Sequence, residues 1–313
     1  MILQHPRSPL VAHISEYGAN MYRLSYQEQG VEIALLDGYP EDSDLLRSQP
    51  HYKGSKLFPF ANRIKDGRYG FRGNSYQLHT NETARQNAMH GLVWAAPFAL
   101  TSQGTDADHA WVSYELLHLP TEDTAGAADH YAGYPFAFSL KVTYRLLGNE
   151  LQCETRVCNL SPAETLPFTD GWHPYFCLST NAIDELYLQL PPADHLPTDD
   201  RMIPTGEKYT FSDFTYPEPI GQRHFDTGFC LHTALPSCRH YTRLQNPAKG
   251  MVLSIWQDAA YGYLQVYTPK HRQSIAIEPM SGAPDALNNQ MGLTLLDPEQ
   301  IWTGTYGITV ANS

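Results

Sequence analysis

A glutamate in the C-terminal part of the chain, Glu278, has the surroundings of a ligand-binding carboxylate. It belongs to SIAIEP (residues 274–279), whose alternating pattern predicts a β-strand with Ile275 and Ile277 facing the core. Glu278 then faces the other side with a serine and an alanine, which are small enough to leave room for a ligand. The proline that follows ends the strand ladder, so the carboxylate would lie beside a loop. A solvated surface glutamate is the competing interpretation.

A histidine in a second predicted strand, His173, could exchange a proton with the same ligand. In GWHPYF (residues 171–176), strand geometry places His173 on the face of Gly171 and opposite Trp172, so the glycine implies open space above the backbone. An imidazole can hold a proton near pH 7, and burial can raise the pKa of a carboxyl toward neutrality. Such a pair on either side of a reacting group suits general acid–base catalysis. A buried structural histidine is the competing interpretation.

Three weaker signals could supply ligand-binding groups. Asn62 and Arg63 come just before a predicted hairpin, where a surface arginine is the ordinary explanation. His90 precedes a glycine, where it could cap a turn, and Asp226 precedes Thr-Gly, where an Asx-turn is common. Other chemistries lack their motifs, since the sequence contains no HExxH, no cysteine-rich zinc pattern, no GxSxG and no Walker loop. We therefore predict no metal site.

The composition limits the classes of partner. The chain has 313 residues and a formal net charge of -12, which argues against nucleic acid or an anionic membrane as its main partner. No apolar run approaches the length of about 20 residues that crosses a bilayer, and the opening segment lacks the pattern of a secretory signal. The five cysteines form no CxxC pair, and an odd number fits a reducing compartment. We expect a cytoplasmic protein with a small-molecule ligand, either a monomer or a homodimer.

Period-two alternation dominates the chain and predicts strands nearly throughout. SLKVTYRLL (residues 139–147) is typical, and 22 glycines and 23 prolines supply the turns that many strands need. GRYGFRGNSYQL (residues 67–78) predicts a hairpin with Gly-Asn between its strands. Only residues 40–49 predict a short helix, with one helical turn at most in residues 297–302. The proline-rich stretch 190–220 is expected to run over the surface. These patterns predict one all-β domain, residues 1–313, of stacked antiparallel sheets.

Six segments of the chain, in collinear order, resemble the motifs of the aldose 1-epimerase (galactose mutarotase) family. The likeness extends from SKLFPFANRI (residues 55–64) to EPMSGAPDALNN (residues 278–289) and is carried by ANRIKDGRY, MHGLVW, DGWHPYF, FDTGF, LQVYTP and IAIEPMSGAPDALN. One such match is weak, but six in order are specific. The resemblance implies a large antiparallel β-supersandwich, which agrees with the strand pattern, and an enzyme that needs no metal or organic cofactor.

The resemblance also implies a role for each candidate residue in interconverting the α and β anomers of a hexose. Glu278 would be the general base and His173 the general acid. The sugar-binding groups would be Asn62, Arg63, His90, Asp226 and Gln265. The chain departs from the family pattern around these groups: Trp and Pro flank His173, Leu follows the His-Gly pair, and Pro follows Thr268. These differences alter the walls of the site and leave the acid–base pair in place.

Two other functions remain open on the same fold. A hexose-6-phosphate 1-epimerase would need basic residues around the phosphate, and several surround Arg63 in the sequence: Lys53, Lys56, Lys65, Arg68, Arg72 and Arg85. A non-catalytic carbohydrate-binding protein would not need to keep an acid–base pair. A glycoside hydrolase generally requires two carboxylates flanking the bond, and the sequence places only one glutamate suitably.

Overall fold

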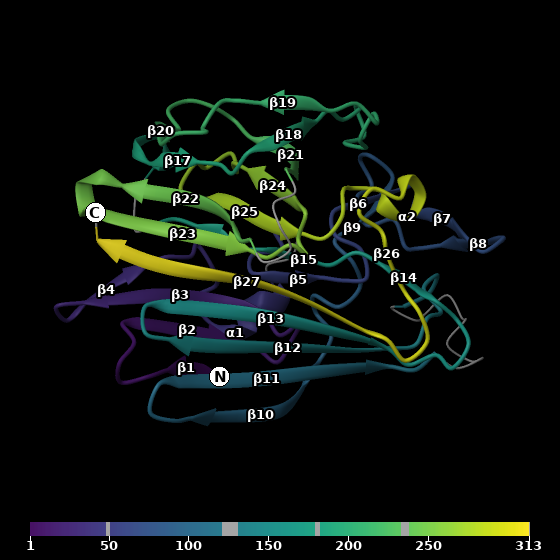
Figure 1. Ribbon diagram of the computed structural model, residues 1–313, viewed down its shortest axis with the longest axis horizontal. Helices are drawn as coiled ribbons and strands as arrows, with labels where there is room; N and C mark the ends of the chain where they lie inside the picture. The colour runs from purple at the N-terminus through teal and green to yellow at the C-terminus, as the bar shows by residue number, and fades with distance from the viewer. Residues whose placement is uncertain (48–50, 121–130, 179–181, 233–237, 313) are drawn as a thin grey trace.

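The computed structural model describes residues 1–47, 51–120, 131–178, 182–232 and 238–312. Within these residues the chain folds into antiparallel sheets, as Figure 1 shows. The largest, a nine-stranded sheet, has the order β10 (Ala99–Thr105), β11 (His109–His118), β12 (Phe138–Leu147), β13 (Glu150–Asn159), β27 (Ile301–Asn312), β23 (Met251–Gln257), β22 (His240–Asn246), β17 (Tyr187–Gln189) and β20 (Glu218–Pro219).

Two further sheets lie behind the nine-stranded sheet in the view of Figure 1. The eight-stranded sheet of the described residues has the order β19 (Tyr209–Phe211), β18 (Ala193–Leu196), β21 (Asp226–Leu231), β24 (Tyr263–Tyr267), β25 (Ile275–Met280), β15 (Gly171–His173) and β5 (Ser55–Leu57), with β16 (Tyr175–Phe176) also paired to β25. The four-stranded sheet of this part of the chain runs through β1 (Ile2–Gln4), β2 (Leu10–Ile14), β3 (Met21–Glu28) and β4 (Val31–Ala34).

The remaining elements are short. Among the described residues, three strand pairs stand apart from the large sheets: β14 (Leu166–Phe168) with β26 (Thr294–Leu296), β6 (Arg63–Lys65) with β9 (Asn87–Met89), and β7 (Arg68–Phe71) with β8 (Asn74–Gln77). The helices of these residues are α1 (Asp42–Arg47), α2 (Ala286–Asn289) and single 3-10 turns at Ile183–Glu185 and Pro247–Lys249.

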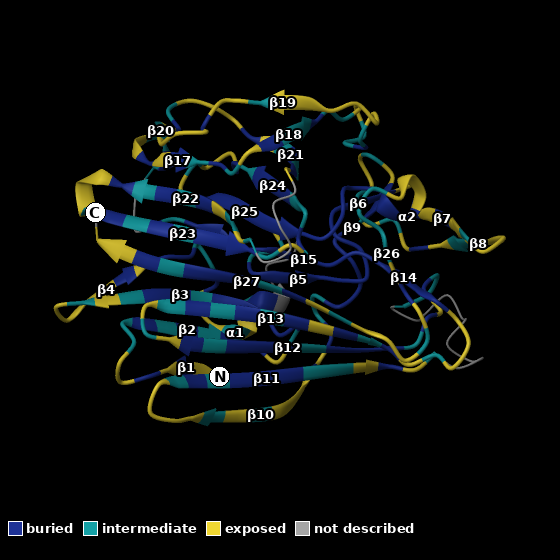
Figure 2. Cartoon of the chain, viewed as in Figure 1, coloured by how far each residue is buried: buried dark blue, intermediate teal, exposed yellow. Residues whose placement is uncertain are grey.

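A continuous apolar core joins the three sheets. Leu24 of β3, Leu140 and Val142 of β12, and Ile275 and Ile277 of β25 are all fully buried in it. In β12 and β25 every second residue enters this core, which is why the alternation in the sequence predicted these faces. Figure 2 shows buried residues along the middle strands and exposed ones on the outer strands β10 and β19. The predicted all-β class with stacked antiparallel sheets is confirmed. The single domain over residues 1–313 stays a prediction.

Several local predictions need correction. The stretch 190–220 was expected to run over the surface, but it holds β18, β19 and β20, and β18 lies inside the eight-stranded sheet. These strands are only two to four residues long, too short to show a period among the prolines. In the β7–β8 hairpin the turn is Arg72-Gly73, one residue earlier than predicted, with φ of 48° and 82°, as a type I′ turn requires.

The helical predictions had mixed outcomes. The predicted helix at 40–49 is α1, and residues 48 and 49 lie outside the described part of the chain. Residues 297–302 form a turn that leads into β27 and no helix. The single turn α2 was not predicted, because four residues are too few for helical periodicity to appear.

A buried ion pair joins β5 to the segment just before β15. The side chains of Lys56 and Asp170 are 0% exposed and are bonded to each other. Lys56 Nζ also donates to Thr155 Oγ1 at 3.0 Å and lies 4.4 Å from the centre of the Trp172 ring. The Tyr261 hydroxyl donates to Asp170 Oδ2 at 2.7 Å. Because Lys56 pairs with Trp172 in the sheet register, this cluster stabilises the strand that carries His173.

Removing one partner of this ion pair is expected to destabilise the fold strongly. Lys56→Met leaves the buried Asp170 carboxylate without its counter-ion, and breaking such a pair costs about 3–5 kcal/mol of unfolding free energy. Urea unfolding followed by tryptophan fluorescence measures the change. The double variant Lys56→Met/Asp170→Leu removes both charges and should regain most of the loss. A single variant within about 1 kcal/mol of the wild type would contradict this prediction.

Candidate functional site

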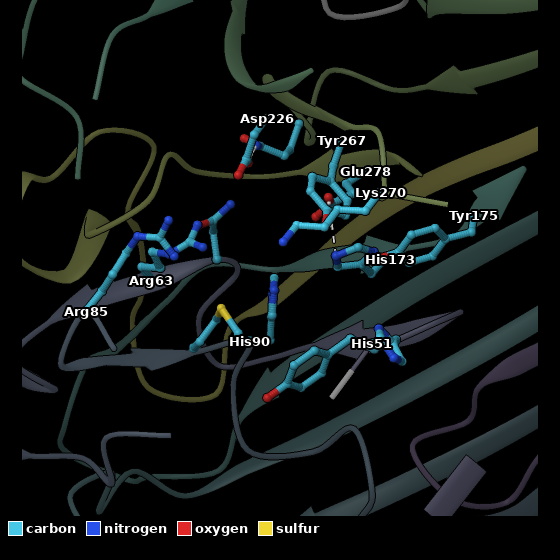
Figure 3. A pocket seen from close by; sticks show the side chains of 14 residues that line it. His51, Arg63, Arg85, His90, His173, Tyr175, Asp226, Tyr267, Lys270 and Glu278 are labelled. Atoms are coloured by element: carbon cyan, nitrogen blue, oxygen red, sulfur yellow. Dashed lines mark hydrogen bonds and ion pairs between the residues drawn. The ribbon is translucent and has the colours of Figure 1, made fainter. Parts of the chain in front are cut away.

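A cavity of about 400 Å³ opens beside the eight-stranded sheet, on the side away from the apolar core. All seven residues selected from the sequence line it, although they come from distant parts of the chain: Asn62, Arg63, His90, His173, Asp226, Gln265 and Glu278. Figure 3 labels five of them, which point toward a common space: Arg63, His90, His173, Asp226 and Glu278. The cavity therefore brings together all the residues that the sequence analysis selected as catalytic or sugar-binding candidates.

Neighbouring strands of the sheet position the carboxyl groups. Glu278 on β25 is directly opposite Gln265 on β24, so both side chains leave the same face. Gln265 Nε2 donates to Asp226 Oδ1 at 2.9 Å across the next strand pair. Gly228 lies opposite Gln265 on β21, and a Cβ there would come within 3.2 Å of Gln265 Oε1. The glycine thus leaves the space in which the amide reaches Asp226.

His173 projects into the cavity because its neighbour Trp172 is drawn into the core. The Trp172 indole is 1% exposed and packs against Tyr306. His173, one residue on, points the other way and stacks on Tyr175, with 4.9 Å between ring centres. Its Nε2 lies 3.4 Å from Glu278 Oε1, the contact dashed in Figure 3. The acid and base candidates therefore share one wall of the cavity, and the expectation of groups on opposite sides of a ligand is wrong.

Two residues in the left-handed backbone conformation form another part of the cavity wall. Asn62 and His90 have φ of 60° and 64°, and the His90 amide donates to the Asn62 carbonyl at 2.8 Å. Such conformations are uncommon outside glycine and cluster at functional sites. Gly91 has φ of 75°, and a Cβ there would come within 2.3 Å of the Phe58 carbonyl oxygen. Only glycine fits after His90, which explains the His-Gly pair.

Burial sets the ionisation of the acid–base pair. It raises the pKa of Glu278 well above its ordinary value, and the negative charge of Asp226 adds to this shift while Arg63 opposes it. Burial lowers the pKa of His173 to about 3 and that of His90 well below its usual value. The expectation that His173 holds a proton near pH 7 is therefore wrong for the cavity as it stands. The imidazole is neutral there, and Glu278 retains its proton to higher pH than an ordinary carboxyl.

Several polar atoms of the cavity have no hydrogen-bond partner among the described residues: Glu278 Oε2, His173 Nδ1 and His90 Nδ1. Buried polar atoms in folded proteins are nearly always bonded, so these atoms fit a polar ligand. No three His, Cys, Asp or Glu side chains of the described residues gather as they would around a metal ion. The arrangement can bind a ligand rich in hydroxyl groups and move a proton on it.

Other lining residues were not selected from the sequence: His51, Tyr52, Met89, Tyr175, Tyr267 and Lys270. Tyr175 and Tyr267 lie two residues from His173 and Gln265, so the strand period could have identified them. Lys270 lies in the loop after β24, where no pattern pointed to it. Its ammonium group points toward the centre of the cavity in Figure 3 and forms no ion pair with a described residue.

Most of the basic residues near Arg63 in the sequence lie elsewhere in the structure. Lys56 is buried in the core with Asp170, and Lys53 is paired with Asp37. Of the six basic residues named near Arg63, Arg85 is the one that lines the cavity.

No helix in the described part of the chain is both long enough and apolar enough to cross a membrane.

Comparisons with known proteins agree with this architecture. The family model described as aldose 1-epimerase matches residues 2–309. The Escherichia coli protein named uncharacterized protein YihR is 28% identical over 95% of this chain and 90% of its own length. Human galactose mutarotase is 27% identical over 78% of this chain and 70% of its own. The structure of a galactose mutarotase-like protein from Clostridium acetobutylicum superposes with a TM-score of 0.85 at 21% identity, covering 98% of this chain and 94% of that one.

The chain thus has the antiparallel β-sandwich fold of the galactose mutarotase-like structures. The chain belongs to the aldose 1-epimerase family.

Proposed function

We propose that the protein interconverts the α and β anomers of an aldose. The observation that carries this proposal is the 3.4 Å approach of His173 Nε2 and Glu278 Oε1 inside a cavity with unpartnered polar atoms. The anomeric hydroxyl loses a proton to Glu278 while the ring oxygen gains one from His173. The ring then opens, C1 rotates, and reclosure on the other face reverses both transfers. Positioned proton transfer of this kind typically contributes about 10²–10⁴-fold.

The position of Glu278 and His173 on one wall of the cavity suits this chemistry. The two oxygens that exchange protons are bonded to the same carbon, so two adjacent groups can serve both at once. The reaction needs one transferable proton on the pair. Burial holds this proton on Glu278 and leaves His173 neutral, so the proton must pass to the imidazole, across the 3.4 Å between the two groups, before Glu278 can act as a base.

The other lining groups bind the sugar. An arginine side chain stays protonated in proteins, so Arg63 cannot accept a proton. It binds the sugar or stabilises the charge that develops on it. Asn62 and His90 lie beside it and face the ring oxygen. The Asp226 carboxylate, held by Gln265, accepts hydrogen bonds from hydroxyl groups.

A polarimetric screen tests the proposal. The purified protein should accelerate the mutarotation of at least one of several free aldoses, such as glucose or galactose, above the spontaneous rate. Binding of a sugar by calorimetry without any acceleration would favour a non-catalytic carbohydrate-binding protein and contradict the proposal.

A hexose 6-phosphate is a second candidate substrate, favoured by Arg85 on the cavity wall and by the ammonium group of Lys270, which pairs with no carboxylate of the described residues. If the substrate carries a phosphate, Lys270→Gln should lower kcat/KM for glucose 6-phosphate by about tenfold and leave the value for glucose within a few-fold, since a charge-assisted bond contributes about 1.5–3 kcal/mol. The matched control is Lys249→Gln in an exposed turn. Equal rates for both sugars in the wild type, unaffected by Lys270→Gln, would exclude this candidate.

A further inference from the structure

A carboxylate outside the cavity, that of Glu82, determines how Arg63 faces it. Arg63 Nε donates to Glu82 Oε2 at 2.9 Å, and Nη2 donates to Oε1 at 3.0 Å. This is a bidentate pair, the geometry in which a carboxylate fixes the plane of a guanidinium. Both partners are nearly buried, each side chain being 11% exposed. Glu82 does not line the cavity, whereas Arg63 does.

The bidentate pair leaves one edge of the guanidinium for a ligand. With Nε and Nη2 engaged by Glu82, Nη1 is the remaining nitrogen, and it donates to Asn62 Oδ1 at 3.0 Å. An arginine on a flexible stem could present any of its donors. Here Glu82 engages Nε and Nη2, which leaves the Nη1 edge for Asn62, itself a residue that lines the cavity.

Glu82 is itself held on several sides. Asn87 Nδ2 donates to Oε2 at 2.8 Å and Arg85 Nη1 donates to Oε1 at 3.0 Å. The backbones of Glu82 and Asn87 also pair as an isolated bridge. From outside, Arg201 donates to the carbonyl oxygens of Arg85 and Gln86, at 2.9 Å and 3.0 Å. The carboxylate thus accepts four hydrogen bonds within a braced loop, so its position is defined independently of any ligand.

The charge of Glu82 supports this role. Burial by itself would raise the pKa of Glu82, but the hydrogen bonds from Arg63 and Asn87 and the charge of Arg63 lower it below the usual value. The Glu82 carboxylate is therefore ionised in the folded protein near neutral pH. It also balances the positive charge of Arg63 beside the cavity.

We infer that Glu82 is a positioning residue, which acts on the sugar only through the orientation it imposes on Arg63. This inference rests on the proposed mutarotase function. In Glu82→Gln the amide nitrogen faces a guanidinium donor, the bidentate pair is lost, and the Nη1 edge is no longer held toward the cavity. Misplacement of a binding group by about 1 Å can cost up to about 10²-fold, so we expect kcat/KM for mutarotation to fall about 10–100-fold.

A double-mutant cycle distinguishes positioning from a general structural role. If Glu82 acts through Arg63, Glu82→Gln should change kcat/KM by less than about twofold when it is added to Arg63→Ala. If the two effects multiply, Glu82 acts by another route and the inference is wrong. The matched control is Glu32→Gln, which removes the same group from an exposed pair with Arg23, at 2.7 Å and away from the cavity, and should leave kcat/KM unchanged. Should Glu82→Gln fail to fold, Glu82→Asp, which keeps the charge but shortens the reach, replaces it in the cycle.

A crystal structure of Glu82→Gln decides the inference even if the wild type shows no mutarotation. The inference is supported if the Arg63 guanidinium has moved away from Asn62 in this variant. It is overturned if the guanidinium has not moved. Absence of mutarotation in the wild type would instead count against the proposed function alone.

Discussion

Glu278→Gln is expected to lower kcat for mutarotation by about 10²–10⁴-fold, the range that a positioned proton-transfer group supplies. The amide has the shape of the carboxyl group but cannot accept the anomeric proton. Because Glu278 is buried with one oxygen unpartnered, the substitution breaks no hydrogen bond from a described residue to that oxygen. Polarimetry gives the rate, and Glu185→Gln, an exposed carboxylate outside the cavity, is the control. Activity within a few-fold of the wild type would remove Glu278 from the mechanism.

The same substitution should stabilise the protein at neutral pH. Because the fold raises the pKa of Glu278 above its ordinary value of 4.5, the folded state favours the protonated carboxyl. Its contribution to stability is complete below that value and is lost as the pH rises through the raised pKa. Glu278→Gln should therefore unfold at higher urea concentration than the wild type at pH 7.5, with the difference vanishing near pH 4. Because the pair must keep one proton, which burial holds on Glu278, the alkaline limb of the wild-type rate profile should follow the raised pKa of Glu278.

His173→Asn should lower kcat by a similar factor and change KM by only a few-fold. Asparagine can still donate a hydrogen bond, but it cannot carry a proton to the ring oxygen. The residues proposed to bind the sugar hydroxyls, Asp226 and Gln265, are untouched. Steady-state polarimetry separates kcat from KM, and His195→Asn, a half-buried histidine on β18 outside the cavity, is the control.

The alternative outcome for His173 is a loss of folding. His173 stacks on Tyr175 and lies next to a tryptophan of the core, so a structural histidine would show itself as a large drop in the urea midpoint. A variant that unfolds easily, and retains full activity per folded molecule, would assign His173 to the core.

The local pattern of the sequence was sufficient for much of the fold. Strand side chains alternate with a period of two whatever the strand pairs with, so Ile275 and Ile277 were placed in the core and Glu278 on the opposite face. The same reasoning placed His173 opposite Trp172. The predictions that failed concerned strands and helices of two to four residues, where no period can be read. There the pairing partner, not the local pattern, decides the structure.

What surrounds the acid–base pair depended on contacts between distant segments. Pairing of β24, β25 and β15 places Glu278 and His173 on one wall, and no spacing in the sequence contains that geometry. The loop after β24 places Lys270 at the cavity, and the loop between the Arg63 and His90 motifs supplies Glu82 behind Arg63.

The sequence by itself placed Glu278 and His173 on one face of each strand, because strand side chains alternate with a period of two, and the six motifs of the family resemblance selected the residues proposed to carry chemistry. The tertiary structure alone decided their ionisation. Burial by side chains from several strands removes water from Glu278 and His173, disfavours both charged forms, and so keeps the proton on the carboxyl and off the imidazole.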